Sequence, residues 1–281
     1  MRDLRTTTGT SAENLCDTCH MVSKAGNAAE AVPAGSQAVT RALGMLQCFR
    51  DNPGDLGVSE LARRMNLSVS TAHRIARTLA ATGFLALAEG SLRYRLGPAV
   101  AELGQLSLYQ RGIHLAADEL TEVAKATGTA ADLAIRSGTD AVILAGTSVA
   151  LTAGLGLRRP LHSTALGKVL LAWAPPGEDD LDALPPLTAY TARTITHKAD
   201  LRAELDRVRE AGYALNDGES AFGVRTIAVP VLRASGHVHA ALALRSTSDM
   251  LTDDRLSWFL SRAQRCADAL AVLLLEPGQR Y

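Results

Sequence analysis

The 281-residue sequence has few cysteines and no long apolar run, and each shortage excludes a class of protein. Its four cysteines, at positions 16, 19, 48 and 266, form no disulfide framework, which argues against a small secreted domain. No apolar run reaches the roughly 18–20 residues of a membrane span. The first residues also lack the basic-then-apolar pattern of a signal peptide. We therefore expect a cytoplasmic protein without a membrane partner.

Aromatic residues make up only 4% of the chain, and the net charge at pH 7 is zero. Hydrophobic residues reach 47%, enough for two cores built mainly from Ala, Leu and Val. The zero net charge hides an uneven distribution, because residues 36–98 carry eight arginines, no lysine and four acidic residues, a net charge of +4. Residues 99–281 carry a net charge of −3. Arginine without lysine favours bidentate recognition of anionic groups over loose charge attraction.

Two short amphipathic helices are predicted within residues 58–83, both with the i, i+3, i+4, i+7 period of one buried face. The apolar positions are Val58, Leu61, Ala62 and Met65 in the first helix and Ala72, Ile75, Ala76 and Leu79 in the second. We expect Ser59 to cap the start of the first helix. Gly83 suits a left-handed residue at the end of the second.

The second of these helices presents polar and cationic side chains opposite its apolar face. They are Ser70, Thr71, His73, Arg74 and Arg77. Hydroxyls and guanidiniums on an exposed helix face suit the major groove of DNA. We expect the side chains near the helix start, including Arg74, to reach base edges, and Arg77, one turn later, to meet phosphate.

Residues 84–87 and 92–96 predict two strands joined by a turn at residues 89–91. In the second strand Leu92, Tyr94 and Leu96 alternate with Arg93 and Arg95, so we expect one apolar and one cationic face. A hairpin after two helices is typical of a winged helix-turn-helix, and Arg93 and Arg95 join the candidate DNA contacts. Two alternatives stay open: an ordinary helical core, and a helix-turn-helix that docks a protein in place of DNA.

The rest of the chain divides around this module. Residues 1–35 have no periodicity and are expected to be disordered. They include Cys16-Asp-Thr-Cys19-His20, formally a c-type haem pattern that we attribute to chance, and Met21 is an alternative natural start. A helix at 37–50, with Val39, Leu43, Leu46 and Phe49 on one stripe, completes a winged domain at 36–97. Pro98 opens a linker helix at 98–112.

Residues 113–276 predict an α+β domain of the sensor type. Helices are expected at 113–127, 164–173, 201–211 and 253–275, and strands at 130–135, 141–146, 226–232 and 237–245. His162, Ser163 and Lys168 raise the question of a hydrolase. No Gly-x-Ser-x-Gly or Ser-x-x-Lys pattern accompanies them, so we expect no enzyme activity, no cofactor and no metal site.

The whole of residues 36–276 resembles the IclR family of bacterial transcriptional regulators. The matching fragments are residues 38–43, 60–62, 67, 70–74, 83–84 and 94–97, then 159–168, 212–214, 223–225 and 228–231. The resemblance implies homodimers, or dimers of dimers, on palindromic operators, and a GAF-like C-terminal domain that binds a small effector, often an organic acid. It implies a regulator of a catabolic operon, with repression as the expectation and activation as the alternative.

The resemblance also implies an effector pocket. Its candidate residues are Ala165, Leu166, Asn216, Asp217, Val224, Thr226, Ala243 and Arg245. Three of them depart from the family pattern, since Asn216 stands where a carboxylate is usual, and Ala243 and Arg245 stand where hydroxyls are usual. A guanidinium forks onto carboxylates, so we expect an anionic effector or a carbonyl-rich one such as a ureide. The alternative is a structural ion pair of Arg245 with Asp217, Glu219 or Asp249.

Overall fold

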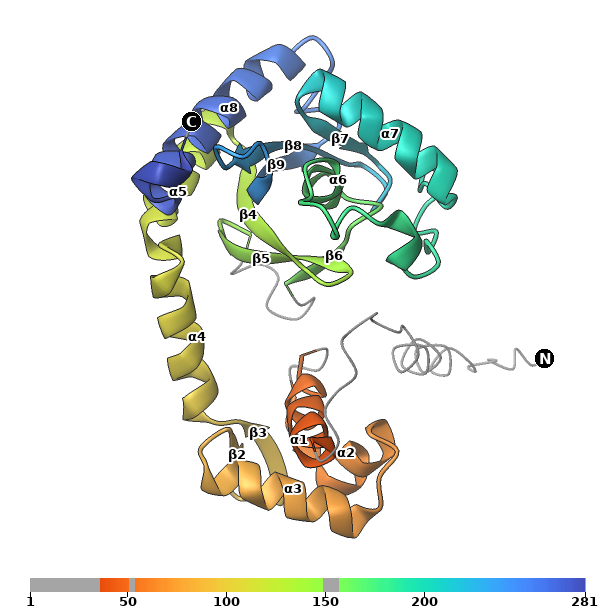
Figure 1. The fold of residues 1–281 in the computed structure, drawn as a ribbon, viewed down its shortest axis with the longest axis vertical. Helices are drawn as coiled ribbons and strands as arrows, with labels where there is room; N and C mark the ends of the chain where they lie inside the picture. Colours follow the sequence, from red (N-terminus) through yellow and green to blue (C-terminus); the bar gives the residue numbers. More distant parts are fainter. Residues whose placement is uncertain (1–35, 51–53, 149–156, 281) are drawn as a thin grey trace, which may run out of the picture.

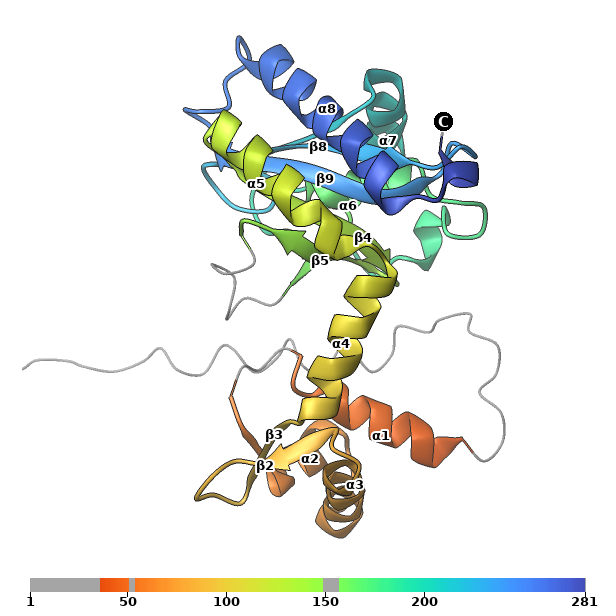
Figure 2. The ribbon, with the colours of Figure 1, turned by 90° about the vertical axis from the view of Figure 1, so that its left-hand side faces the viewer.

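The computed structural model describes residues 36–50, 54–148 and 157–280 (Figure 1). The expectations about residues 1–35, including the Cys16-Asp-Thr-Cys19-His20 motif, lie outside this range. The chain forms a small N-terminal unit and a larger C-terminal unit, joined by one helix (Figures 1 and 2). Among the described residues, no helix is both long and apolar enough to cross a membrane.

The N-terminal unit packs three helices against a small antiparallel sheet of strand order β1-β3-β2. Its elements are α1 (Gln37–Gln47), β1 (Leu56–Gly57), α2 (Val58–Arg64), α3 (Val69–Ala81), β2 (Leu85–Leu87) and β3 (Arg93–Leu96). Met45, Leu61, Ala72 and Ala76 are buried at its centre. The two helices and the hairpin predicted from the sequence are therefore present, in the order of a winged helix-turn-helix.

The helix ends follow local chemistry, with one correction. Ser59 does not cap α2, because the helix begins at Val58 after Gly57, which supplies no side-chain cap. Ser68 instead caps α3, and its hydroxyl accepts a hydrogen bond from the Thr71 N–H at 3.3 Å. Gly83 has a φ of 77°, which confirms the left-handed residue expected after α3.

Several apolar residues that we expected in this core are exposed. On α1 the buried residue is Met45, whereas Val39 and Leu43 are 59% and 55% exposed. On the wing, Tyr94 is buried but Leu92 is 86% exposed, so the expected apolar face of β3 is wrong there. Sequence periodicity identifies an apolar face without showing what covers it.

Helix α4 (Pro98–Gln110) is the connection between the two units (Figure 1). It begins with Pro98 in its first turn, as expected, and ends before Gly112, which has a φ of 68°. None of its residues is buried, and Leu103, Leu106 and Tyr109 are all more than half exposed. Tyr109 stacks on His114, with ring centroids 4.6 Å apart, whereas Leu103 and Leu106 are largely uncovered by the described residues.

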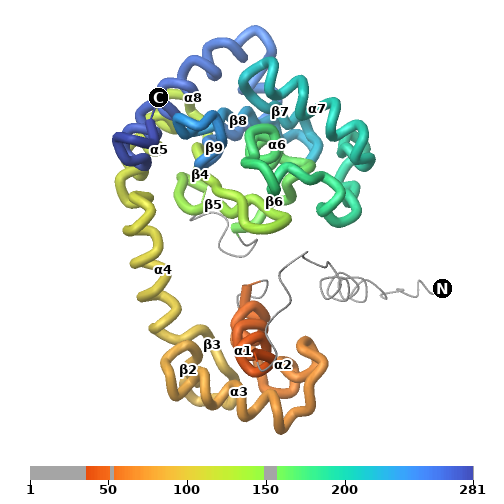
Figure 3. The backbone as a smooth tube through the Cα atoms, in the orientation of Figure 1, coloured from red at the N-terminus to blue at the C-terminus, as the bar shows by residue number. Residues whose placement is uncertain are grey.

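The C-terminal unit is a six-stranded antiparallel sheet of order β6-β5-β4-β9-β8-β7 with helices on both faces (Figures 2 and 3). The strands are β4 (Ala130–Ser137), β5 (Asp140–Gly146), β6 (Arg158–Pro160), β7 (Ala214–Asp217), β8 (Val224–Leu232) and β9 (Val238–Thr247). The helices are the short η2 (Ile113–Leu115), η3 (Leu181–Ala183) and η4 (Pro277–Gln279), and α5 (Ala116–Thr127), α6 (Ala165–Ala172), α7 (Lys198–Ala211) and α8 (Leu256–Leu274). The two edge strands, β6 and β7, were not predicted.

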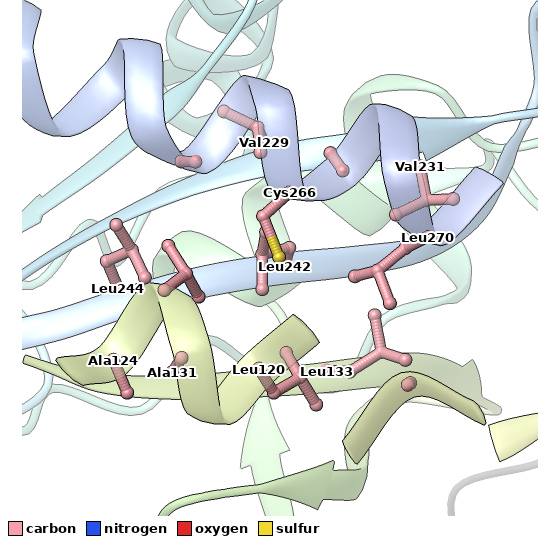
Figure 4. Packing of buried hydrophobic residues seen from close by; sticks show 14 of the residues in the cluster. Leu120, Ala124, Ala131, Leu133, Val229, Val231, Leu242, Leu244, Cys266 and Leu270 are labelled. Atoms are coloured by element: carbon pink, nitrogen blue, oxygen red, sulfur yellow. The ribbon is translucent and has the colours of Figure 1, made fainter. Parts of the chain in front are cut away.

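Helices α5 and α8 lie side by side over one face of the sheet (Figure 2). Leu120 of α5 and Leu270 of α8 pack with Leu133 and Leu242 of the strands beneath them (Figure 4). Each such fully buried leucine stabilises the fold by about 1.5–3 kcal/mol. Cys266 lies in the same cluster, where burial raises the pKa of its thiol to about 12.

Helix α6 covers the opposite face and lies unusually close to the chain before it. A Cβ atom on Gly167 would lie 2.2 Å from the Leu161 carbonyl oxygen, so only glycine fits there. Thr164 caps this helix, accepting a hydrogen bond from the Gly167 N–H at 3.1 Å. All eight residues of α6 are buried, so the helix lies inside the unit, between the sheet and α7.

Candidate DNA interface and effector pocket

The outer face of α3 carries the candidate DNA contacts. His73, Arg74 and Arg77 are exposed, and within the described part of the chain neither arginine forms a hydrogen bond or ion pair through its side chain. The buried residues of α3 are Ala72, Ala76 and Leu79, on its inner face. The helix therefore offers free guanidinium donors to a ligand outside the unit.

Ser70 and Thr71, the two candidate hydroxyl residues at the start of α3, differ in exposure and in hydrogen bonding. Ser68 donates to the Thr71 hydroxyl at 2.8 Å, and Thr71 is partly buried, so this threonine belongs to the helix cap. Ser70 is exposed and lies 3.1 Å, oxygen to oxygen, from the Ser68 hydroxyl. Of the two, Ser70 is the one whose position suits a contact with DNA.

The wing arginines are held by acidic residues and carbonyls of their own unit. Arg93 donates to the Asp55 carbonyl through Nε at 2.9 Å and lies 3.2 Å from a Glu60 carboxylate oxygen. Arg95 lies 3.6 Å from the Asp55 carboxylate, and Arg64 lies 2.8 Å from Glu60. The wing arginines thus have acidic residues of the N-terminal unit beside them. The α3 arginines, Arg74 and Arg77, have none among the described residues.

A groove of about 780 Å³ separates α3 from the wing. His73 and Arg77 line it from the helix, and Leu87 and Leu92 line it from the hairpin. Arg93 also lines the groove from the wing and Glu60 lines it from α2, so its walls mix charged and apolar side chains. The cations among them suit the phosphates of a nucleic acid backbone.

In the C-terminal unit, most candidate effector residues lie on one face of the sheet. The strand register places Asn216, Thr226 and Arg245 opposite one another on β7, β8 and β9. Val224 and Ala243, two residues along their strands, share that face. Ala165 and Leu166 begin α6, which packs over it, and both are buried. Seven of the eight residues thus lie on α6 or on the face of the sheet that α6 covers.

Asp217 is the exception. One residue after Asn216, it points to the opposite face, because side chains alternate along a strand. Its carboxylate lies 2.7 Å from Arg193 and 3.9 Å from Arg225. Asp217 therefore does not share the face of the sheet that carries the other strand candidates.

Arg245 has partners that the sequence did not suggest. Its Nη2 donates to the Ser148 hydroxyl at 3.1 Å, and that hydroxyl donates in turn to a carboxylate oxygen of Asp132 at 2.5 Å. Among the described residues, Arg245 forms no ion pair with Asp217, Glu219 or Asp249, the partners considered from the sequence. The sequence offered one sign of this contact, since Asp132 is an acidic residue within the otherwise apolar run of β4.

A buried lysine of α6, Lys168, connects the candidate site to α7 by binding Glu204. Lys168 of α6 is 1% exposed and donates to Glu204 at 2.9 Å, to the Leu215 carbonyl at 3.0 Å and to Glu219 at 2.5 Å. Burial raises the pKa of Glu219, although Lys168 opposes the shift. At Glu204 burial acts in the same sense, but Lys168 and Arg207 outweigh it, and the pKa lies below its usual value.

The turn after β7 joins this lysine cluster to the pocket. The Glu219 N–H donates to the Asn216 side-chain oxygen at 2.8 Å, and the Asn216 amide donates to Ser220 at 2.7 Å. Asn216 is 2% exposed. The amide is thus used to shape the turn, which accounts for a neutral residue at this position.

His162 and Ser163 do not form a catalytic pair in the described structure. His162 Nε2 lies 2.9 Å from the Thr188 carbonyl oxygen, and burial lowers the pKa of the imidazole. The Ser163 hydroxyl is buried and has no hydrogen-bond partner among the described residues. A serine nucleophile needs a base within hydrogen-bond reach, and this geometry supplies none.

Comparison with known proteins matches both units. The family model described as "IclR helix-turn-helix domain" matches residues 38–87, and the one described as "Bacterial transcriptional regulator IclR C-terminal" matches residues 108–272. The chain is 34% identical over 250 residues to the HTH-type transcriptional regulator XynR of Escherichia coli, covering 86% of this chain and 98% of that one. It is 28% identical over 251 residues to the HTH-type transcriptional repressor AllR of Escherichia coli, covering 86% and 91%.

Solved structures give the same result for the fold. An IclR-type transcriptional regulator from a Silicibacter species superposes with a TM-score of 0.76 at 27% identity, covering 87% of this chain and all of that chain. The Thermotoga maritima IclR superposes with a TM-score of 0.62 at 28% identity, covering 84% and 98%. The relatives named here are regulators, and their similarity extends across both units.

Proposed function

The chain belongs to the IclR family of bacterial transcriptional regulators, and on this premise we propose that it binds a palindromic operator as a homodimer and releases it when a small anionic effector binds. The observation that carries the proposal is the exposed face of α3, where Arg74 and Arg77 have no side-chain partner in the described structure. The protein is a transcriptional regulator and not an enzyme.

Dimerisation is supported by two apolar surfaces that the described chain leaves uncovered. Val39 and Leu43 project from α1, and Leu103, Leu106 and Tyr109 from α4, all more than half exposed. Exposed apolar patches of this kind mark protein interfaces. A single recognition helix covers too few base pairs for genomic specificity, so two helices about one DNA turn apart are required. A dimer of dimers is compatible with the same surfaces.

The operator prediction is tested by footprinting the upstream regions of neighbouring genes. Paired protections, about 10 base pairs between centres, are expected if the dimer presents two α3 helices to successive major grooves. Full-affinity protection of one isolated half-site would contradict the dimer model.

The effector is expected to bind on the α6 face of the sheet, where Arg245, Thr226 and Asn216 meet. The relative AllR is a repressor by name, and we propose repression for this chain too. A reporter fused to the target promoter decides between repression and activation, since higher expression in a deletion strain indicates a repressor and lower expression an activator.

Effector binding must favour one dimer geometry over another to change operator affinity. Helix α4 is the covalent route between the two units.

A second candidate function is a ligand-sensing protein whose helix-turn-helix docks another protein. The apolar wing residues Leu87 and Leu92 favour this reading, whereas the free cations of α3 favour DNA. The two predict opposite responses to salt, because phosphate contacts release counterions and apolar contacts do not.

A further inference from the structure

Arg245 of β9 is connected to a buried aspartate through a serine. Asp132 of β4 is 4% exposed, and Ser148, which follows β5, is 1% exposed. The Ser148 N–H donates to one carboxylate oxygen of Asp132 at 3.2 Å, and its hydroxyl donates to the other at 2.5 Å. Arg245 Nη2 donates to the same hydroxyl at 3.1 Å. Three segments distant in the sequence thus meet in one hydrogen-bonded group.

The two charged members set the direction of the hydrogen bonds in this group. A carboxylate only accepts hydrogen bonds and a guanidinium only donates them. The Ser148 hydroxyl must therefore give its single proton to Asp132 and accept a proton from Arg245. No proton of this hydroxyl remains for a ligand, so the donors that the group can offer to a ligand are those of Arg245.

The serine orients the arginine while leaving most of its donors unused. Asp132 lies opposite Ala243 of β9, one diagonal step from Arg245 on the same face of the sheet. A direct Arg–Asp pair commonly occupies two guanidinium donors in a fork. Here the contact with Ser148 uses Nη2 alone, and Arg245 Nε and Nη1 have no partner within the described residues. The guanidinium is therefore held in place and still able to bind an acceptor.

The strands around this group are built to fit it. Gly146 of β5 lies opposite Asp132, and a Cβ atom there would lie 2.3 Å from an Asp132 carboxylate oxygen, so glycine makes room for the carboxylate. Thr226 of β8 lies opposite Arg245, and its hydroxyl forms no hydrogen bond with the described part of the chain. A ligand that binds Arg245 therefore has a second donor on the neighbouring strand.

We propose that Asp132 and Ser148 are positioning residues, which hold the Arg245 guanidinium ready for a carboxylate of the effector. The inference rests on the proposed effector site and adds to it two residues that act through Arg245. An arginine that is already held in one conformation loses less side-chain entropy when it binds an anion. Loss of the serine hydroxyl should therefore weaken the binding of acids. It should have little effect on uncharged analogues, which form weaker hydrogen bonds with a guanidinium.

The test uses the full-length protein and three pairs of probes that differ only in charge: acetate and acetamide, butyrate and butyramide, and benzoate and benzamide. The melting temperature is measured with each probe, because a ligand of the folded state raises it by mass action, and calorimetry gives the Kd. At least one acid is expected to stabilise the protein and to bind about tenfold or more tightly than its amide. Stabilisation by no acid, or equal affinity for acid and amide, overturns the proposal.

Variants test the two positioning residues with the acid that binds best. Ser148→Ala removes the bridging hydroxyl and should weaken that acid about tenfold, with the Kd of its amide changed less than about threefold. Asp132→Asn keeps the shape of the side chain and should weaken the acid in the same sense, so it repeats the test if Ser148→Ala does not fold. Ser137→Ala is the matched control, because the Ser137 hydroxyl accepts from Arg158 at 3.2 Å at the other end of β4, and it should leave both Kd values unchanged.

A double-variant cycle separates positioning from a purely structural role. If Ser148 acts through Arg245, Ser148→Ala should cause no further loss of acid affinity when Arg245→Gln is already present. A structural defect would lower acid affinity equally in both backgrounds. Equal losses, or an unchanged Kd for the acid in folded Ser148→Ala and Asp132→Asn, overturn the proposal.

The same variants distinguish this inference from the proposed function. Acid binding that survives Arg245→Gln places the effector elsewhere and contradicts the proposed effector site. Acid binding that is lost in Arg245→Gln but kept in Ser148→Ala and Asp132→Asn contradicts the inference alone. Neither measurement requires DNA, so the absence of operator binding would contradict only the proposed regulation.

Discussion

Lys168→Met is expected to destabilise the C-terminal unit strongly, because it leaves Glu219 buried without its counter-charge. The lysine is 1% exposed and donates three hydrogen bonds, two of them to carboxylates. Removing one member of a buried ion pair costs about 3–5 kcal/mol. Glu204 loses less, since Arg207 remains 2.7 Å from it and its side chain is partly exposed. We therefore expect the free energy of unfolding to fall by about 3–5 kcal/mol.

The pH dependence identifies the cause of this loss. Burial already raises the pKa of Glu219, and removing Lys168 raises it further. A folded-state pKa above the unfolded value means that the native state holds the proton more tightly. The deficit of Lys168→Met should therefore be smallest below the unfolded pKa and grow as the pH rises through the folded one.

Urea unfolding measures both effects, with the fluorescence of Trp173 and Trp258 reporting on the C-terminal unit. The double variant Lys168→Met/Glu219→Gln removes the stranded charge and should recover about 1–3 kcal/mol at pH 8. Arg207→Met is the control, because it removes a cation that is largely exposed. A loss below about 1 kcal/mol in Lys168→Met, within the range of an exposed ion pair, would refute the reasoning.

The remaining predictions concern DNA contacts, assembly and pH. Arg74→Ala should cost about 1–3 kcal/mol of operator affinity and relax specificity, whereas Arg77→Ala should weaken all sequences alike; equal, uniform losses in competition assays would show that the helix phase is misassigned. Leu103→Glu should lower the dimer fraction in sedimentation, and Ala101→Glu, on the other side of α4, should not; a dimer that tolerates both moves the interface elsewhere. His239 has its pKa lowered to about 4 by burial and by Arg233 and Arg111. Stability should therefore fall as the pH drops from 6.5 toward 4, by on the order of 2 kcal/mol, and a His239→Gln variant with the same slope would rule this histidine out.

The sequence was sufficient for the elements whose pattern is local. The α3 helix shows its buried face through Ala72, Ala76 and Leu79 and its end through Gly83, so its position follows from spacing. Its cap at Ser68 was not predicted. Helix α4 was expected from Pro98 and is present. The short edge strands β6 and β7 were not predicted, since three or four residues carry too little periodicity to differ from a loop.

The site was harder to predict, because its contacts join residues distant in sequence. The family resemblance named Arg245 and Asn216 as candidates, but the partner of Arg245 is 97 residues away at Ser148. The wing arginines appeared free in the alternation of β3, yet Arg93 is held by Asp55, 38 residues earlier. Asp217 comes one residue after Asn216 in β7, so its side chain lies on the opposite face of the sheet. Exposed apolar residues such as Leu43 show the remaining limit, since a pattern does not distinguish a core from an interface.

The central claim is that α3 recognises DNA through its unpaired cations, and the salt dependence of operator affinity tests it most directly. Fluorescence anisotropy with the footprinted operator should show affinity falling by about 10³ or more between 50 and 200 mM salt, for a dimer that makes six or more phosphate contacts. Arg77→Ala should make the slope shallower in the same titration. An affinity that is unchanged across this range, or an Arg77→Ala slope equal to that of the wild type, would contradict the account.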